Sequence, residues 1–279
     1  MGANPDAYAQ AVSRVEAALS SRREGLGPLA ADFFVDGGDL EVVKTALSDL
    51  AADFAIQPAA NRRKGLLIAD MDSTIINVEC LDELADFAGV KAQVSEITER
   101  AMRGELAFEG ALRERVGMLK GLGVSALQAC YDERVKLNPG AETLVRTMAK
   151  HGARCALVSG GFTFFTSRVA EAAGFHLNRA NTLIEQDGVL TGAVGDPILG
   201  KEAKLAALRE ETAALGLTPA DALAVGDGAN DLAMIEAAGL GVAYRAKPIV
   251  AAQADAKVDH TDLTTLLYFQ GYKAEEFHP

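Results

Sequence analysis

Continuous apolar runs recur along the chain and alternate with stretches of helical spacing. The runs occupy residues 65–69, 153–159, 222–227 and, less markedly, 239–244. Runs of this kind, which lack polar alternation, are typical of strands buried on both faces of a parallel sheet. Helices are expected between and after them, at residues 141–151, 163–173, 202–215 and 231–238. The alternation predicts an α/β fold with a doubly wound, mostly parallel sheet.

The first and second apolar runs are separated by far more chain than one crossover needs. The excess, about residues 79–138, is helical in pattern and amphipathic near residues 81–88 and 112–119. We therefore expect a helical cap inserted into a core that spans residues 63–279. The dipeptide Asp187-Gly188, placed between two largely apolar segments, predicts a β-hairpin.

Residues 1–62 lack the long apolar runs of the later chain, and their pattern predicts a small α+β block. A helix is expected over residues 5–25, with short strands at 33–35 and 54–56. A block of this size buries little surface by itself, so it is expected to pack against the core. A regulatory or homodimer-forming module is one interpretation of this block.

Composition narrows the class of protein. Hydrophobic residues make up 49% of the chain, which excludes general disorder. The formal net charge of −12 excludes a protein that coats nucleic acid or anionic membranes. Cys80, Cys130 and Cys155 lie far apart, which argues against a disulfide framework and against a cysteine zinc site. No apolar span approaches the ~18 residues of a membrane helix, so a cytoplasmic protein is expected.

Polar side chains follow the apolar runs where each strand is expected to end. Asp70 and Asp72 follow the first run, Ser159 ends the second, and Asp227 and Asp231 follow the third. The carboxyl ends of parallel strands meet at one edge of a sheet, so these groups are expected to converge. Two carboxylates ~4 Å apart repel by about 4 kcal/mol at an effective dielectric of ~20, so the cluster needs a cation. Oxygen ligands without histidine or cysteine favour Mg²⁺, and such a site suits phosphoryl transfer.

The spacing of Asp70 and Asp72 suggests that the two carboxylates have different roles in one reaction. An extended backbone places residues two apart on the same side. One carboxylate could attack while the other moves the proton of the leaving group, and aspartate is a known covalent nucleophile in phosphoryl chemistry. Taken singly, each could equally be a helix cap or a solvated loop residue.

Four short motifs carry a resemblance to a known family. They are D-M-D-S-T at residues 70–74, Ser159, a downstream lysine, and G-D-G-A-N-D at residues 226–231. In this order they resemble the signature motifs of the haloacid dehalogenase superfamily over about residues 64–250, and among its members the phosphoserine phosphatases most closely. The resemblance implies a Rossmann-like core and Mg²⁺-dependent hydrolysis of O-phospho-L-serine through an aspartyl-phosphate, the last step of phosphorylated-pathway serine biosynthesis. A phosphatase or phosphotransferase acting on another small phosphomonoester is the alternative.

The resemblance also implies roles for the acidic residues. Asp70 is the nucleophile, and Asp72 is the general acid that later serves as the base. Mg²⁺ is held by the carboxylates of Asp70 and Asp227 and by the backbone carbonyl of Asp72. Asp231 supports the waters of the metal.

The same resemblance implies a phosphate site. Ser159 and the Gly160 amide hold phosphate oxygens, and Asn230 lies close by. A lysine neutralises the phosphate, and both Lys201 and Lys204 are candidates. The family pattern places this lysine four residues before an apolar helix position, which Lys201 satisfies. We therefore expect Lys201 to bind phosphate and Lys204 to be a solvated helix residue.

The cap residues point to the substrate. Glu79 lies nine residues after Asp70, where phosphoserine phosphatases use a carboxylate to pair with the substrate ammonium. The resemblance gives Arg115 a bidentate contact with the substrate carboxylate and makes Met102 and Phe108 an apolar wall. The expected partner is a small phosphorylated amino acid. Without the motifs, the same residues would indicate only surface charges and core side chains.

Overall fold

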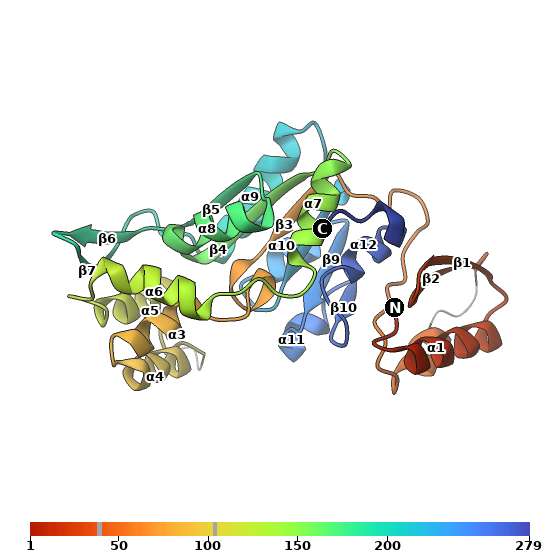
Figure 1. Cartoon of the computed structure of the whole chain (residues 1–279), viewed down its shortest axis with the longest axis horizontal. Helices are drawn as coiled ribbons and strands as arrows, with labels where there is room; N and C mark the ends of the chain where they lie inside the picture. The colour runs from red at the N-terminus through yellow and green to blue at the C-terminus, as the bar shows by residue number, and fades with distance from the viewer. Residues whose placement is uncertain (38–40, 103–104) are drawn as a thin grey trace.

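One parallel sheet forms the centre of the computed structural model, which describes residues 1–37, 41–102 and 105–279. Among these residues, six strands pair in parallel in the order β10-β9-β8-β3-β4-β5. They are β3 (Leu66–Ala69), β4 (Arg154–Phe162), β5 (Leu177–Asn181), β8 (Ala222–Gly226), β9 (Leu240–Tyr244) and β10 (Ala256–Val258). Helices pack on both faces of this sheet (Figure 1), which confirms the predicted doubly wound α/β fold.

The helices predicted between these strands are present. They are α7 (Ala141–Lys150), α8 (Thr163–Ala173), α9 (Lys201–Ala214) and α10 (Leu232–Ala237). Shorter elements complete the core, namely a 3₁₀ turn η2 (Pro219–Asp221), α11 (Pro248–Ala251), α12 (Thr265–Phe269) and a second 3₁₀ turn η3 (Ala274–Glu276). No helix in the described ranges is long and apolar enough to cross a membrane.

Alternate side chains of β3 enter two different hydrophobic cores. Leu67 and Ala69 join the larger core, to which α7 and α8 contribute. Leu66 and Ile68 join a second core, to which α9 and α10 contribute. All four side chains are fully buried. Because both faces of the strand are covered, the strand appears in the sequence as an unbroken apolar run.

Helices inserted between β3 and β4 form the cap. They are α3 (Cys80–Phe87), α4 (Lys91–Met102), α5 (Phe108–Gly117) and α6 (Val124–Arg134). The two ends of the insertion lie side by side, because the Asn138 side chain donates to the carbonyls of Thr74 and Ile76 at 2.8 and 2.9 Å. The helical segment predicted at about residues 79–138 is therefore held next to the end of β3 (Figure 1).

The hairpin predicted at Asp187 and Gly188 is present as β6 (Leu183–Gln186) and β7 (Val189–Val194). Both turn residues have a positive φ, 54° and 78°, as a two-residue type I′ turn requires. Leu190 also makes backbone hydrogen bonds of 2.8 Å with Gly121 and Leu122 of the cap. Figure 1 shows the hairpin alongside α5 and α6. The cap is thus attached to the core by this hairpin as well as by its own two ends.

The N-terminal block lies at one end of the molecule (Figure 1). It contains α1 (Pro5–Ala18), β1 (Arg22–Gly27), β2 (Ala30–Phe34) and α2 (Glu41–Leu47). The single helix predicted over residues 5–25 is wrong beyond Ala18, because β1 pairs antiparallel with β2. Two glycines in β1 disfavour a helix there. The strand predicted at residues 54–56 is reduced to one bridge, between Ala55 and Ala256.

The linker after this block is joined to the core by Arg62. Its guanidinium binds Asp32 of β2 through two hydrogen bonds of 2.6 and 2.8 Å. The same group donates to the carbonyl of Phe269 in α12 at 3.1 Å. Because the side chains of Arg62 and Asp32 are only 15% and 17% exposed, this pair fixes the block against the core.

Asp53 is a second connection, and its removal is expected to destabilise the protein. Its carboxylate is buried and accepts hydrogen bonds from the amides of Asp259, His260 and Thr261 and from the Thr261 hydroxyl. Asp53→Asn replaces an acceptor with a donor facing these groups, and should lower the free energy of unfolding by about 3 kcal/mol in urea titrations. The exposed Asp132→Asn is the matched control, and equal effects of the two would contradict this role.

Candidate active site

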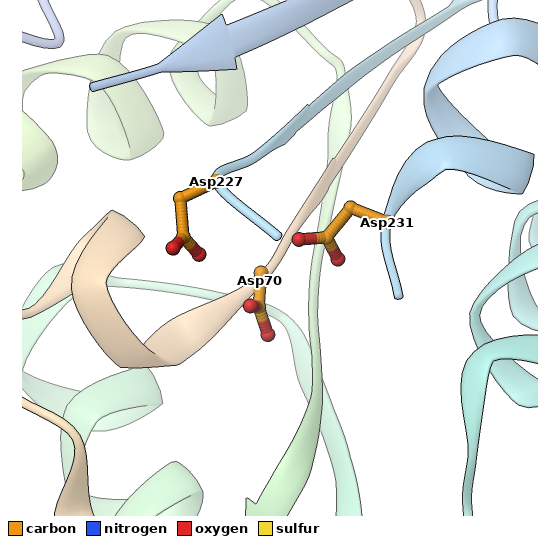
Figure 2. Close-up of side chains that lie close together, drawn as sticks. All are labelled: Asp70, Asp227 and Asp231. Atoms are coloured by element: carbon orange, nitrogen blue, oxygen red, sulfur yellow. The ribbon is translucent and has the colours of Figure 1, made fainter. Parts of the chain in front are cut away.

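Acidic side chains from the ends of two neighbouring strands meet at one edge of the sheet. Asp70 directly follows β3, Asp227 directly follows β8, and Asp231 precedes α10. Carboxylate oxygens of these three residues all lie within 4.8 Å of one another (Figure 2). Asp70 and Asp231 are buried, and Asp227 is partly buried. The structure therefore brings together three of the acids that the sequence places after its buried strands.

Burial and mutual repulsion make this cluster unfavourable as a set of free carboxylates. Burial raises the pKa of Asp70 well above its usual range, and the charge of Asp231 adds to the effect. Burial also raises the pKa of Asp227 to about 6, again with a contribution from Asp231. Positive charge placed among these groups opposes both effects, so the cluster favours a bound cation.

The ammonium group in the cluster belongs to Lys204 and not to Lys201. Nζ of Lys204 lies 2.6 Å from an oxygen of Asp70 and 2.6 Å from an oxygen of Asp231. Although burial lowers the pKa of Lys204, these carboxylates raise it above its usual value, so the amine is charged. The side chain of Lys201 is 67% exposed, and its amine lies 3.8 Å from Glu202. The expectation that Lys201 supplies this charge is therefore wrong.

Position along α9, and not helical phase, distinguishes the two lysines. The buried side chains of α9 are Lys204, Ala207, Leu208, Glu211 and Thr212. They repeat at intervals of three and four residues, as one face of a helix does. Lys201 is the first residue of α9 and is exposed. Lys201 lies three residues before Lys204 and seven before Leu208, so helical spacing places both lysines on this face. The sequence pattern alone therefore does not separate them, and the difference in their burial does.

Asp72 lies beside the three-carboxylate cluster, on a tight turn η1 (Met71–Ile75) that follows β3. Its carboxylate accepts a hydrogen bond from the Cys80 amide at 3.1 Å and lies 3.4 Å from the Ser159 hydroxyl. Burial, followed by the charge of Glu79, raises the pKa of Asp72 to about 7. Asp72 can therefore carry a proton near neutral pH, as a general acid must.

The end of β4, where its pairing with β5 is irregular, lies next to Asp72. Ser159 is buried, and its hydroxyl accepts a hydrogen bond from the Gly161 amide at 2.9 Å. The Gly160 carbonyl accepts a hydrogen bond from the Asn181 side chain at 2.8 Å, which fixes this end of the strand. A Cβ at Gly161 would lie 2.7 Å from Asp72 Oδ2, so this position needs glycine. Sequence reasoning did not single out the roles of Gly161 and Asn181.

Two polar side chains flank Asp227. The Thr74 hydroxyl lies 3.4 Å from Asp227 Oδ1. The Asn230 side chain folds over Gly228, since a Cβ at Gly228 would lie 2.3 Å from its amide oxygen. The structure therefore places Asn230 near the acidic cluster, and its place beside the phosphate stays a prediction. Thr74 lies in a recognised motif but was not proposed as a site residue.

The two cap charges expected to recognise the substrate each have a different hydrogen-bond partner, and the charge of Glu79 acts on Arg115. Glu79, immediately before α3, is exposed and accepts a hydrogen bond of 2.6 Å from the Ser73 hydroxyl. Arg115 on α5 donates to the Thr98 hydroxyl at 3.4 Å. Burial lowers the pKa of Arg115, and the charges of Asp82 and Glu79 oppose this effect. A carboxylate and a guanidinium whose charges affect each other suit a ligand that carries one positive and one negative group.

Phe108, the first residue of α5, lies over the core. A Cβ on Gly160 or on Gly200 would be 3.4 Å from its ring, so the ring lies between the end of β4 and the start of α9. The residue is 40% exposed, which leaves part of the ring available for a ligand. Met102 ends α4, and its side chain lies outside the described residues, so its place in an apolar wall stays a prediction.

Comparison with known proteins agrees with this geometry. Residues 67–236 match the haloacid dehalogenase-like hydrolase family. The chain belongs to this family. The matched segment contains Asp70, Lys204, Asp227 and Asp231, so all members of the buried cluster lie within the haloacid dehalogenase-like region.

Relatives within the haloacid dehalogenase-like hydrolases include phosphoserine phosphatases. The phosphoserine phosphatase of Polaromonas sp. is 48% identical over 207 residues, which span 72% of this chain and 88% of that protein. A solved hydrolase of the family from Salmonella enterica serovar Typhi has a TM-score of 0.84 at 30% identity, covering 95% and 94% of the two chains. A solved phosphoserine phosphatase with an analogue of its phospho-aspartyl intermediate has a TM-score of 0.69 at 39% identity, covering 74% and 99%. The chain is therefore a hydrolase with the predicted fold class.

Proposed function

We propose that this hydrolase converts O-phospho-L-serine and water into L-serine and phosphate through an aspartyl-phosphate on Asp70. The position of Asp70 carries the proposal, because its carboxylate follows the central strand, contacts Lys204 and adjoins Asp227. A carboxylate that attacks phosphorus needs positive charge around the phosphoryl group. The reaction would complete the phosphorylated route of serine biosynthesis. The free cysteines agree with a reducing compartment, for which we propose the cytoplasm.

We propose Mg²⁺ as the cofactor, because the clustered donors of Asp70, Asp227 and Asp231 are all carboxylate oxygens. Asp231 binds Lys204 through one oxygen and accepts a backbone amide through the other. Asp70 and Asp227 are therefore the direct ligands in our proposal, together with the backbone carbonyl of Asp72, and Asp231 would orient waters of the metal. The ion, when bound, supplies charge that neutralises the phosphoryl oxygens.

In the first chemical step an oxygen of Asp70 forms a bond to phosphorus, and the bond from phosphorus to the serine oxygen breaks. Asp72 donates its proton to that oxygen, so that L-serine leaves as a neutral alcohol. Its raised pKa of about 7 supports this role. Ser159 and the Gly160 amide hold the phosphoryl oxygens, while the Lys204 ammonium stabilises their charge.

In the second step water attacks phosphorus and the bond to Asp70 breaks, which releases phosphate and restores the carboxylate. Asp72, now ionised, accepts the proton of that water. The cap must exclude water before the first step and admit it for the second. The Phe108 ring, which lies against Gly160 and Gly200, supports a cap that covers this part of the site with apolar surface.

Substrate recognition in this proposal depends on Arg115 and Glu79. Arg115→Ala is expected to raise KM for O-phospho-L-serine by about 10- to 100-fold with a smaller change in kcat, because a bidentate contact to the substrate carboxylate is lost. Initial rates of phosphate release measure both constants. Arg113→Ala, on the same helix and paired with Asp196, is the matched control. An unchanged KM in Arg115→Ala would count against an amino-acid substrate.

A panel of small phosphomonoesters tests the function as a whole, with phosphate release measured in Mg²⁺ and in a chelator. We expect the highest kcat/KM for O-phospho-L-serine and loss of turnover in the chelator. A higher kcat/KM for a phosphorylated sugar or alcohol would favour a different substrate. Phosphorylation of added glycerol would indicate a phosphotransferase. A regulatory or homodimer-forming role for residues 1–62 stays a separate prediction.

A further inference from the structure

We infer that Ser73 is a positioning residue for substrate recognition, which holds Glu79 where it can meet the substrate ammonium. The inference rests on the proposed function, because it concerns the recognition of phosphoserine. It gives a role to a motif residue that neither chemical step uses. The role follows from a hydrogen bond, from the backbone conformation of Ser73 and from the charges around Glu79.

The hydroxyl of Ser73 donates a hydrogen bond of 2.6 Å to one carboxylate oxygen of Glu79. The amide of Ser73 donates to the Val78 carbonyl at 3.2 Å, so this residue closes the segment 73–79 through both its backbone and its side chain. A hydrogen bond to an ionised acceptor is stronger than one between neutral groups. Since a carboxylate has two oxygens, this bond orients Glu79 and leaves capacity for an ammonium donor.

The backbone of Ser73 has φ of 54° and ψ of 0°, in the left-handed region. Glycine adopts this conformation freely, whereas a residue with a Cβ does so at a cost. Serine at this position is explained by its hydroxyl, which the left-handed turn directs to Glu79. The preceding residue, Asp72, is extended and directs its carboxylate to Cys80 and Ser159 instead. The turn thus directs the side chain of Asp72 to Cys80 and Ser159, and the side chain of Ser73 to Glu79.

The charges around Glu79 explain why its side chain needs a hydrogen bond that fixes its orientation. Its charge raises the pKa values of Asp72 and Asp227 and opposes the lowering of the Arg115 pKa, so it is near enough to act on the catalytic acids and on Arg115. Opposite charges that recognise the two ends of a zwitterion also attract each other. A Glu79 side chain without its serine partner could turn towards Arg115, and both groups would then be less available to the substrate.

A double-mutant cycle tests the inference, with kcat and KM for O-phospho-L-serine as the measured quantities. We expect Ser73→Ala to raise KM about tenfold and to change kcat less than twofold. Ser73→Gly should give the same rise, because it fits the left-handed backbone but lacks the hydroxyl. In a Glu79→Ala background, Ser73→Ala should have no further effect on KM.

Several results would overturn the inference. One is an unchanged KM in Ser73→Ala, and another is a fall in kcat alone. A third is that Ser73→Ala raises KM equally in the wild-type and the Glu79→Ala backgrounds. The fourth is a wild-type KM in Ser73→Gly. The last result would assign the effect to backbone strain. If the wild-type enzyme hydrolyses other phosphomonoesters but not O-phospho-L-serine, the proposed function fails and the inference fails with it. Thermal unfolding of each variant identifies any loss of fold.

Discussion

Asp70→Asn is expected to lose at least about 10⁴-fold in kcat, the largest effect of any single substitution in this enzyme. An amide cannot form the aspartyl-phosphate and is a poor ligand for a hard cation. Phosphate release in the presence of Mg²⁺ and O-phospho-L-serine measures the loss. No neighbouring carboxylate can replace Asp70 in the proposal, because both oxygens of Asp231 are bonded, one to Lys204 and one to the Gly228 amide, and Asp227 follows a different strand.

The same substitution should leave the fold intact. Burial and the charge of Asp231 raise the pKa of Asp70, so its ionised form lowers stability near neutral pH when no cation is bound. Asp70→Asn should therefore retain at least the wild-type free energy of unfolding in a chelator. Asp187→Asn, at the hairpin turn, is the matched control and should keep full activity. Turnover near the wild-type rate in Asp70→Asn would contradict the nucleophile assignment.

Lys204→Met is expected to reduce kcat/KM by about 10³-fold, because it removes the ammonium group that faces the transferred phosphoryl group. The substitution also leaves Asp70 and Asp231 without their shared partner at 2.6 Å. Breaking a buried pair from one side typically costs about 3–5 kcal/mol, and urea titration in a chelator measures this loss. Added Mg²⁺ should restore part of the stability, since the ion places charge near the same carboxylates.

Lys201→Met is the control that separates this role from a general effect of losing a helix lysine. Lys201 begins the same helix but is exposed and lies near Glu202. We expect kcat/KM within twofold of wild type and no measurable change in stability. Equal losses in the two variants, or a larger loss in Lys201→Met, would contradict the placement of Lys204 in the active site.

The core of the site follows from local sequence pattern and from one topological rule. The apolar runs before Asp70, Ser159 and Asp227 predict buried parallel strands, and parallel strands bring their carboxyl ends to one edge. No further information was needed to expect that the carboxylates of Asp70 and Asp227 converge. The lysine was not predictable in this way, because Lys201 and Lys204 share one face of α9 and only their burial in the folded chain separates them.

Other features depend on contacts between distant parts of the chain, which a local pattern does not encode. The hairpin at Asp187 was predictable from its turn, but its pairing with Gly121 and Leu122 of the cap was not. The pairing of β1 with β2 was not predicted, because the sequence of β1 has no strong alternation of apolar and polar residues. The hydrogen bond between Ser73 and Glu79 depends on the left-handed backbone conformation of Ser73. A serine in a sequence does not predict this conformation.

The most direct test is to identify the residue that carries the phosphoryl group during turnover. The enzyme is mixed with O-phospho-L-serine and Mg²⁺, quenched in acid within the first turnover, reduced with borohydride and analysed by mass spectrometry. We predict that Asp70 is converted to homoserine, since borohydride reduces an acyl phosphate to an alcohol. Reduction at a different residue, or full turnover without any covalent phosphate on the protein, would contradict the central claim.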